Sequence, residues 1–416
     1  MKNRGEPVKQ KVVHFIKLSD VGGIQASLVN LLDTPIIWRK RTHVAIHNGL
    51  DRPLKQWTQR LKSVNANGRW IPVPPILPGR LRKRLRAVLN YLTIRRYRPD
   101  VCVFWNTLPP PWQLRKLTAN GILPLLYDRG VSTLSERNSR NLESYGLFNA
   151  VICNSKATAR LLQLKWQIEV QTFVNRNAVR PDILPGGDRQ SDPKAFPTNN
   201  QVTIGFAGRL VPLKGASLVL VAARELIERR WEVKVDIAGS GSEQPFLNKL
   251  SRELSVDDIV YWRNDCKDMR EFYSSIDVLV CPSLREPFGN VSVEAQAWGC
   301  PVVATGVDGL PETLVDGETG VIVRPGMGLE QYMRYASSVN RLPAFVLDPF
   351  ADQLSEPRAP EPSAIASAIE AICSETDVYE RMSSAARAYS QSEFSFERHA
   401  ERLDEILDRI SAESTD

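Results

Sequence analysis

The stretch GFAGRLVPLKG, residues 205–215, follows an apolar, β-branched run at residues 202–207 and precedes an amphipathic helical pattern that includes Leu218. This order predicts a strand, a glycine-containing turn and a helix. At such a crevice, backbone N–H groups and the helix dipole favour anions, and glycine lets a ligand approach closely. Arg209 and Lys214 add two positive charges. The stretch is therefore a candidate diphosphate-binding loop; the alternative is an ordinary glycine turn with two solvated cations.

Short apolar runs alternate with helical patterns along the chain, which predicts an α/β fold with parallel sheets. The first series of expected strands comprises residues 12–16, 43–47, 101–105, 123–127, 150–153 and 170–174. The second series comprises residues 202–207, 233–238, 259–261, 277–281, 302–304 and 321–323. The sequence therefore predicts two doubly wound domains, one for each series.

Proline marks the expected boundaries, because regular structure does not run through proline- and glycine-rich stretches. Residues 181–200 form the predicted linker between an N-terminal domain, residues 1–180, and a C-terminal domain, residues 201–380. A second proline-rich stretch, at about residues 324–362, is expected to be an irregular insertion. Helical patterns return over residues 381–416, and we expect the last helix to pack back on the N-terminal domain.

The charge of the chain is divided unevenly. The 416 residues carry a net charge of +7, but residues 1–190 hold 32 Lys and Arg against 11 Asp and Glu, which gives +21. The remainder holds 22 against 36, which gives −14. A basic half suggests an anionic partner, such as phosphate groups, a membrane surface or nucleic acid.

A second motif, EPFGNVSVE at residues 286–294, follows the expected strand at residues 277–281 and leads into a helix. Carboxylates accept paired hydroxyl hydrogen bonds well, so Glu286 and Glu294 could hold two different parts of one long ligand, a hexose and a ribose. Backbone N–H groups from Gly289 onward would face its phosphates. The alternative is that Glu286 caps the helix and Glu294 is a solvated helix residue.

Taken together, the motifs resemble those of the retaining glycosyltransferases of family four. The matching positions, in order, are Gly208-Arg209, Lys214-Gly215, Pro282-Ser283, Glu286, Glu294, residues 299–304, Pro311-Glu312 and residues 317–320. The resemblance is closest over residues 203–323 and looser in the N-terminal half, where it rests on Gly22-Gly23 and on Asn154-Ser155-Lys156. It implies the GT-B architecture, in which two Rossmann-like domains face one another across a cleft and the second holds the donor.

The resemblance also implies a chemistry and its residues. The enzyme would transfer a sugar from a nucleotide-diphosphate-sugar, a substrate and not a cofactor, with retention at the anomeric carbon and without a metal ion. Arg209 and Lys214 would neutralise the departing diphosphate, Glu286 would contact the transferred sugar, and Glu294 would bind the ribose. The other expected donor-binding residues are Gly22, Gly23, Gly208, Gly289, Asn290 and Val291.

The chain departs from the family pattern at residues 127–130, which read YDRG. The family often has a histidine near the end of this strand, so Asp128 and Arg129 are the candidates for the group that contacts the sugar or the acceptor. None of the four histidines is assigned to catalysis, because three lie in strand-like runs where a structural role is favoured.

Residues 80–98 hold eight Lys and Arg and no acidic residue, with Leu81, Leu85, Val88, Leu89 and Leu92 on one helical face. We expect these apolar residues to pack in the core and the arginines to attract an anionic membrane surface. The acceptor would then be a glycan or a lipid-linked glycan, as in assembly of bacterial lipopolysaccharide or another surface polysaccharide. No RNA-binding or helix-turn-helix motif accompanies the basic segment, so nucleic acid is not expected as a partner.

Two further features bear on location and on alternatives. The polar N-terminus and the short apolar run after it predict no signal peptide, and hence a cytoplasmic protein. The basic segment at residues 80–98 adds the expectation that it binds the inner face of the plasma membrane peripherally. Six cysteines without a CxxC pair favour neither a disulfide framework nor a zinc site. The alternative functions are a non-catalytic scaffold that binds nucleotide or glycan and a nucleotide-sugar epimerase on the same fold.

Overall fold

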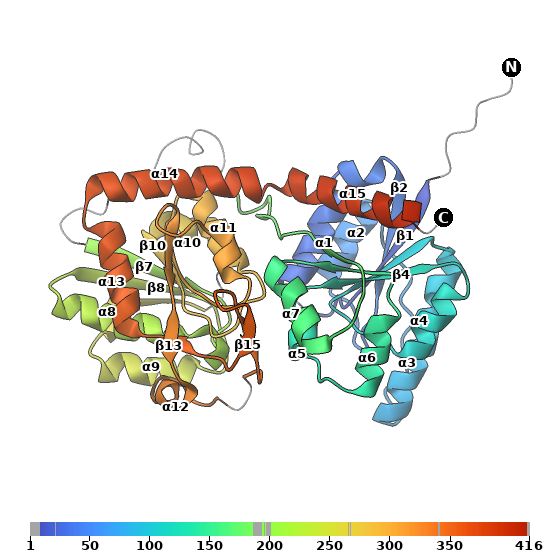
Figure 1. Cartoon of the computed structure of the whole chain (residues 1–416), viewed down its shortest axis with the longest axis horizontal. Coiled ribbons are helices and arrows are strands. Elements are labelled where there is room, and N and C mark those ends of the chain that lie inside the picture. Colours follow the sequence, from blue (N-terminus) through green and yellow to red (C-terminus); the bar gives the residue numbers. More distant parts are fainter. Residues whose placement is uncertain are drawn as a thin grey trace, which may run out of the picture. The chain divides into compact units, whose positions relative to one another are not determined.

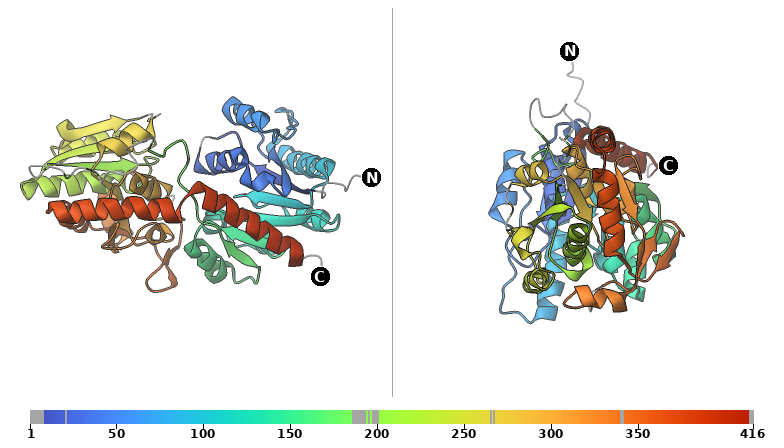
Figure 2. Two further views of the ribbon diagram at one scale, coloured as in Figure 1. Left: turned by 90° about the horizontal axis from the view of Figure 1, so that it is seen from above. Right: turned by 90° about the vertical axis from the view of Figure 1, so that its left-hand side faces the viewer.

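The computed structural model describes residues 9–20, 22–185, 194, 196, 201–264, 266, 268–339 and 342–413. The chain divides into two compact units (Figure 1). Unit 1 comprises residues 1–154, 162–176 and 396–416, and unit 2 comprises residues 155–161 and 177–395. Helices lie on both faces of the central sheet in each unit (Figures 1 and 2). Along the described parts of the chain, no helix is both long and apolar enough to cross a membrane.

Unit 1 is built on a six-stranded parallel sheet with the order β2-β1-β3-β4-β5-β6. Its strands are β1 (Gln10–Ile16), β2 (Arg41–His47), β3 (Val101–Trp105), β4 (Leu123–Asp128), β5 (Ala150–Cys153) and β6 (Thr172–Val174). All six strands predicted for the first series are confirmed, because buried apolar runs between turn residues form the middle of a parallel sheet. The pleated core includes Val13, Phe104 and Leu126, which are almost fully buried.

The helices of unit 1 lie between successive strands in the sequence, except α15, which is the last element of the chain. They are α1 (Gly23–Asp33), α2 (Lys55–Ser63), α3 (Gly79–Tyr97), α4 (Pro111–Thr118), α5 (Val131–Leu134), α6 (Ser139–Gly146) and α15 (Phe396–Glu413), with a 3-10 turn η1 (Ile36–Trp38). A further helix, α7 (Lys156–Trp166), has its first residues in unit 2 and its last in unit 1.

The predicted orientation of α3 is wrong. The side that faces the unit carries Arg86, Asn90 and Ile94, all buried, whereas Leu81 and Leu92 are exposed. Specific contacts explain this rotation: the Arg86 guanidinium lies 5.5 Å from the Trp70 ring centroid, and the Asn90 amide is 3.5 Å from the carbonyl of Asn48. The partners, Trp70 and Asn48, lie outside the helix and earlier in the sequence, so helical periodicity alone does not predict these contacts.

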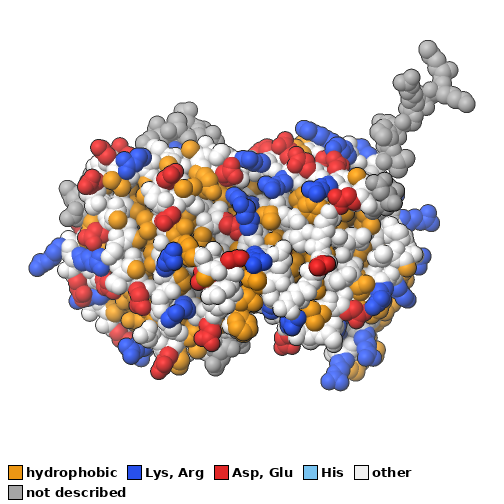
Figure 3. Space-filling view, viewed as in Figure 1, with side chains coloured by type: hydrophobic (Ala, Val, Ile, Leu, Met, Phe, Trp, Pro, Cys, Tyr) orange, Lys and Arg blue, Asp and Glu red, His pale blue; other side chains and the backbone are white. Residues whose placement is uncertain are grey.

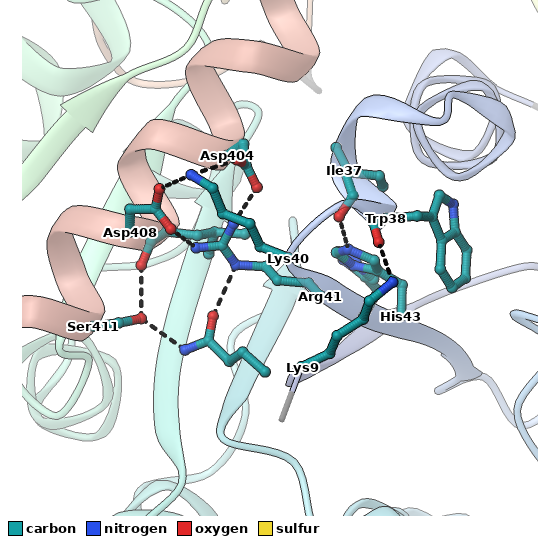
Figure 4. A network of polar contacts seen from close by, with 12 residues as sticks. Lys9, Ile37, Trp38, Lys40, Arg41, His43, Asp404, Asp408 and Ser411 are labelled. Atoms are coloured by element: carbon teal, nitrogen blue, oxygen red, sulfur yellow. Dashed lines mark hydrogen bonds and ion pairs between the residues drawn. The ribbon is translucent and has the colours of Figure 1, made fainter. Parts of the chain in front are cut away.

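A buried arginine fastens the last helix to the sheet of unit 1 (Figure 4). Arg41, at the start of β2, is 2 % exposed and forms ion pairs with Asp404 and Asp408 of α15. Its Nε donates to the Gln10 side-chain oxygen at 2.8 Å, and the Gln10 amide donates to Ser411 at 2.7 Å. Because a buried guanidinium needs counter-charges, this network makes α15 an integral part of unit 1.

Unit 2 has a second six-stranded parallel sheet, with the order β12-β11-β10-β7-β8-β9. Its strands are β7 (Gln201–Ala207), β8 (Glu232–Ala238), β9 (Val260–Arg263), β10 (Val278–Cys281), β11 (Val302–Thr305) and β12 (Gly320–Val323). These confirm the second predicted series. The strand order reverses between β7 and β10, since later strands are added on opposite sides of this pair.

The helices of unit 2 are α8 (Ala216–Glu228), α9 (Gln244–Glu253), α10 (Met269–Ser275), α11 (Asn290–Ala297), α12 (Leu329–Tyr332), α13 (Pro362–Cys373) and α14 (Thr376–Glu393). Its 3-10 turns are η3 (Pro212–Lys214), η4 (Asp257–Ile259), η5 (Leu310–Thr313) and η6 (Met333–Tyr335). The proline-rich stretch at residues 324–362 holds short paired strands, β13 (Pro325–Met327) with β16 (Ala359–Pro360) and β14 (Val346–Asp348) with β15 (Gln353–Ser355).

Much of the predicted linker, residues 186–193, 195 and 197–200, lies outside the described residues. Two described residues of the stretch pack in unit 2. Ile183 is buried with Tyr273 and Leu279, and Phe196 packs against the main apolar cluster.

Candidate functional site

The two sequence motifs meet at one edge of the sheet in unit 2. The loop that starts at Gly208 follows β7, and the loop that starts at Pro282 follows β10. Because β7 and β10 are neighbouring parallel strands, both loops leave the same edge, at the point where the strand order reverses. Ligands of open α/β sheets bind outside the carboxyl ends of strands at such a point.

Glycine is required where the two loops approach each other. Gly215 has φ +67°, and a Cβ there would lie 2.3 Å from the carbonyl oxygen of Pro282. A backbone hydrogen bond of 3.0 Å from Leu284 N–H to the Leu213 carbonyl also joins the two loops. Gly208 has φ +155°, which L side chains rarely adopt. The turn of the first motif is thus a fixed backbone arrangement rather than a loose loop.

The structure brings together two of the three charged residues that were predicted in these loops. Lys214 and Glu286 form an ion pair with each other, and both side chains are largely buried. Ser283 adds a hydroxyl 3.5 Å from the same Glu286 oxygen. Arg209 is exposed. The suggestion that Glu286 caps a helix is wrong, because the N-cap of α11 is Gly289, and no side chain of the described residues caps that helix.

A residue that the sequence analysis missed, Asp308, holds the Glu286 backbone. One carboxylate oxygen of Asp308 accepts from Glu286 N–H at 3.1 Å, and the other accepts from Leu347 N–H at 2.8 Å. The Glu286 carbonyl in turn accepts from Gly309 N–H at 3.1 Å. Burial raises the pKa of Asp308 to about 6. An aspartate shortly after an expected strand does not by itself indicate a site residue, and the contact with Glu286 spans 22 residues of sequence.

Glu294 is buried, so the suggestion that it is a solvated helix residue is wrong. Its side chain is 5 % exposed, in the second turn of α11. One carboxylate oxygen accepts the Tyr273 hydroxyl at 2.8 Å, and the other accepts Arg180 Nε at 3.2 Å. Burial raises the pKa of Glu294, while Arg180 and Tyr273 act against that rise by stabilising the carboxylate. Neither partner was predicted.

The start of α11 presents a close turn. Gly289 has φ +110°, and a Cβ there would lie 2.5 Å from a Leu310 methyl group. Asn290 and Val291 follow as the first two helical residues, and the Asn290 side-chain oxygen accepts from the Asn177 amide at 2.7 Å. The N-cap residue Gly289 has no side chain, so no N-cap side chain competes with an anion for the N–H groups of the first turn of α11.

The remaining predicted residues lie in unit 1. Gly22 is the extended N-cap of α1 and its carbonyl accepts from Ala26 N–H at 3.1 Å; Gly23 is the first helical residue. This turn follows β1, whose neighbours β2 and β3 lie on opposite sides, so it occupies the equivalent reversal point of that sheet.

Asp128 and Arg129 lie at the end of β4 and are both buried. One Asp128 oxygen accepts Gly130 N–H at 2.8 Å and Ser132 N–H at 3.4 Å. The other has no hydrogen-bond partner among the described residues, and burial raises the pKa of this carboxyl. The Arg129 guanidinium lies 6.0 Å and 5.9 Å from the ring centroids of Trp105 and Tyr127.

Comparison with known proteins finds a family match for part of the chain and a fold match for nearly all of it. Residues 188–343 match the family model described as "Glycosyl transferases group 1". The D-inositol 3-phosphate glycosyltransferase of Streptomyces bingchenggensis is 39 % identical over 140 residues, which are 31 % of this chain and 30 % of that protein. The corresponding protein of Kribbella flavida is 32 % identical over 163 residues, 36 % of this chain and 38 % of its own length. The chain thus matches about a third of the length of these curated relatives.

Solved structures match over nearly the whole chain. A glycosyltransferase from Rickettsia africae has a TM-score of 0.73 at 17 % identity and covers 97 % of this chain and 99 % of its own. HepE of Anabaena, solved in complex with UDP and glucose, has a TM-score of 0.68 at 17 % identity and covers 96 % of this chain and 100 % of its own. Likeness at this identity establishes the fold. Residues 188–343 thus match a glycosyl transferases group 1 domain, within a chain that has the two-sheet α/β fold of GT-B glycosyltransferase structures.

Proposed function

We propose that the protein is a retaining glycosyltransferase that moves a sugar from a nucleotide-diphosphate-sugar to a glycan or a lipid-linked acceptor. The observation that carries the proposal is the ion pair of Lys214 with Glu286 at the strand-order reversal of unit 2, on loops that also carry Arg209 and the Gly289 N-cap of α11. The family match covers this same region, and HepE, a structural neighbour, was solved with UDP and glucose.

The proposed chemistry follows from where charge develops. Loss of a nucleoside diphosphate places negative charge on the leaving oxygen, and preorganised cations and backbone N–H groups stabilise that charge. Arg209 is exposed at this edge and available to a phosphate, and the first turn of α11 offers N–H groups from Asn290 and Val291.

Lys214 and Glu286 would act as a pair. Each now neutralises the other. A donor phosphate near Lys214 would share its positive charge, which leaves the Glu286 carboxylate available to accept hydroxyl hydrogen bonds from the sugar. The Asp308 contact fixes the Glu286 backbone during this exchange. Glu294 would bind the ribose with lone pairs not used by Tyr273 and Arg180, because a carboxylate has about four acceptor positions.

The finer proposal concerns the acceptor and the location. The N-terminal half carries 32 basic against 11 acidic residues up to position 190. This charge suits an enzyme that acts at an anionic membrane surface, with a role in lipopolysaccharide or other surface polysaccharide assembly. Asp128 and Arg129 are the proposed contacts to the sugar or acceptor in unit 1.

A transfer assay tests the proposal. The purified chain is incubated with UDP-, GDP- and ADP-sugars and with a membrane lipid extract or soluble glycan, and labelled sugar in either fraction is measured. NMR coupling at the new anomeric centre should report retention. Glu286→Ala should abolish transfer and leave the circular dichroism spectrum unchanged. The control Lys249→Ala, which removes an exposed lysine of α9, should transfer sugar like the wild type.

The other outcomes have defined meanings. Loss of donor without any acceptor, with formation of an isomeric nucleotide-sugar, would replace the proposal by an epimerase. Nucleotide binding without turnover on any acceptor would favour a non-catalytic scaffold. Undiminished transfer by Glu286→Ala would remove this carboxylate from the active site.

A further inference from the structure

Helix α3 presents an apolar stripe to the outside of unit 1. The stripe consists of Leu81, Leu85, Val88 and Leu92, which share one face because they are spaced by three and four residues. Leu81 is 50 % exposed, Val88 43 % and Leu92 52 %. Ile76, just before the helix, is 90 % exposed. Figure 1 shows α3 at the outer edge of the unit.

The opposite face of α3 makes the contacts with the rest of the unit. Arg86, Asn90 and Ile94 lie there and are at most 6 % exposed. The helix therefore turns a mixed face inward and leaves Leu81, Val88 and Leu92 exposed, whereas an ordinary sheet-packing helix buries its apolar stripe. A contiguous exposed apolar patch framed by polar residues is typical of an interaction surface.

Positive charge surrounds the α3 stripe. Residues 52–99 contain 13 Lys and Arg and no Asp or Glu. Arg84, Arg95 and Arg96 are exposed and flank the stripe on the helix surface. Lys and Arg side chains project around the exposed end of α3 in Figure 3. The surface thus combines insertable side chains with a cationic border.

An aromatic residue extends this border on the neighbouring helix. Trp112 of α4 is 36 % exposed and packs against Tyr91 of α3 with ring centroids 6.0 Å apart. The Lys116 ammonium lies 5.7 Å and 5.9 Å from the Tyr91 and Trp112 ring centroids. Tyr91 is buried beneath them, and the exposed tryptophan and lysine suit a boundary between hydrocarbon and water.

We propose that the α3 stripe and Ile76 insert into the interface of an anionic phospholipid membrane, with the surrounding cations on the lipid phosphates. This inference rests on the membrane association proposed above and adds the residues and the mode of binding. A second copy of the chain fits the surface poorly. A symmetric pairing would bring the same cations of both copies together, and residues 52–99 supply no carboxylate to neutralise them.

Vesicle flotation of the full chain tests the inference. Wild-type protein should float with vesicles containing phosphatidylglycerol and much less with phosphatidylcholine alone. The stripe variant Leu81→Ser/Val88→Ser/Leu92→Ser should lose at least tenfold in partitioning at both low and high salt, because it removes insertion. The charge variant Arg84→Gln/Arg95→Gln should lose about fivefold per charge at low salt, which is ~1 kcal/mol each, and less at high salt.

A matched control replaces three exposed apolar residues elsewhere, Leu134→Ser/Met333→Ser/Phe345→Ser, and should float like wild type. Equal flotation of the stripe variant and wild type would overturn the α3 assignment while leaving membrane association intact. Absence of wild-type flotation on any anionic vesicle would overturn both. A wild-type dimer in sedimentation velocity that the stripe variant converts to a monomer would assign the stripe to self-association instead.

Discussion

The buried contact between Tyr273 and Glu294 gives a prediction whose size follows from its geometry. Tyr273→Phe removes the hydroxyl that donates to Glu294 at 2.8 Å and leaves Arg180 as its remaining side-chain donor among the described residues. A hydrogen bond to a charged group contributes about 1.5–3 kcal/mol, and Glu294 is too buried for water to replace it fully. We expect the free energy of unfolding to fall by about 2 kcal/mol.

The pH dependence of this loss identifies its cause. Burial raises the pKa of Glu294, so acidification favours the neutral carboxyl, which needs the lost donor less. The cost of Tyr273→Phe should therefore be smaller near pH 5 than near pH 8 in urea unfolding followed by circular dichroism. Tyr261→Phe, at a 61 % exposed position, is the control and should cost less than about 0.5 kcal/mol. An equal cost at both pH values, or none, would refute the assigned role of the hydroxyl.

Three further predictions follow from other contacts. Asp308→Asn, which replaces an oxygen that accepts from Glu286 or Leu347 N–H by an amide donor, should lower stability by about 2 kcal/mol and slow transfer with little change in nucleotide affinity; unchanged turnover would contradict it. Burial lowers the pKa of His43 and His399 to about 4, so the unfolded chain binds protons that the folded chain does not, and unfolding free energy should fall by on the order of 3 kcal/mol per histidine between about pH 6.5 and pH 4. His399→Gln should flatten that profile, and an unaltered slope would argue against burial as its cause. Arg41→Met should cost about 2 kcal/mol in urea unfolding, because Asp404 and Asp408 of α15 keep only the exposed Lys40 as a counter-charge; a cost below about 0.5 kcal/mol would contradict the network.

Much of the fold could be predicted because its signals are local. Apolar β-branched runs predict all twelve strands of the two main sheets, and the glycines at positions 208, 215 and 289 predict tight turns at their ends. The same local patterns located Lys214 and Glu286 on loops that each follow a strand. They could not predict that these two residues pair, since the pairing depends on which strands become neighbours.

The features missed from the sequence involve contacts between distant residues. Arg180 contacts Glu294 across 114 positions, and Arg41 contacts Asp404 across 363. Neither spacing has a periodic signature. The α3 error has another origin: an amphipathic pattern predicts a buried apolar face, but it does not specify what covers that face. In α3 the buried side is determined by Arg86, which contacts Trp70, and by Asn90, which contacts Asn48.

The most direct test of the central claim is calorimetric titration of the purified chain with UDP, GDP and ADP. The account predicts that one nucleoside diphosphate binds, and that Arg209→Ala and Lys214→Ala each weaken it at least tenfold, about 1.4 kcal/mol, while Arg252→Ala, an exposed arginine of α9, leaves the affinity unchanged. Binding of none of the three, or equal affinity in all four proteins, would contradict a diphosphate site at the carboxyl ends of β7 and β10.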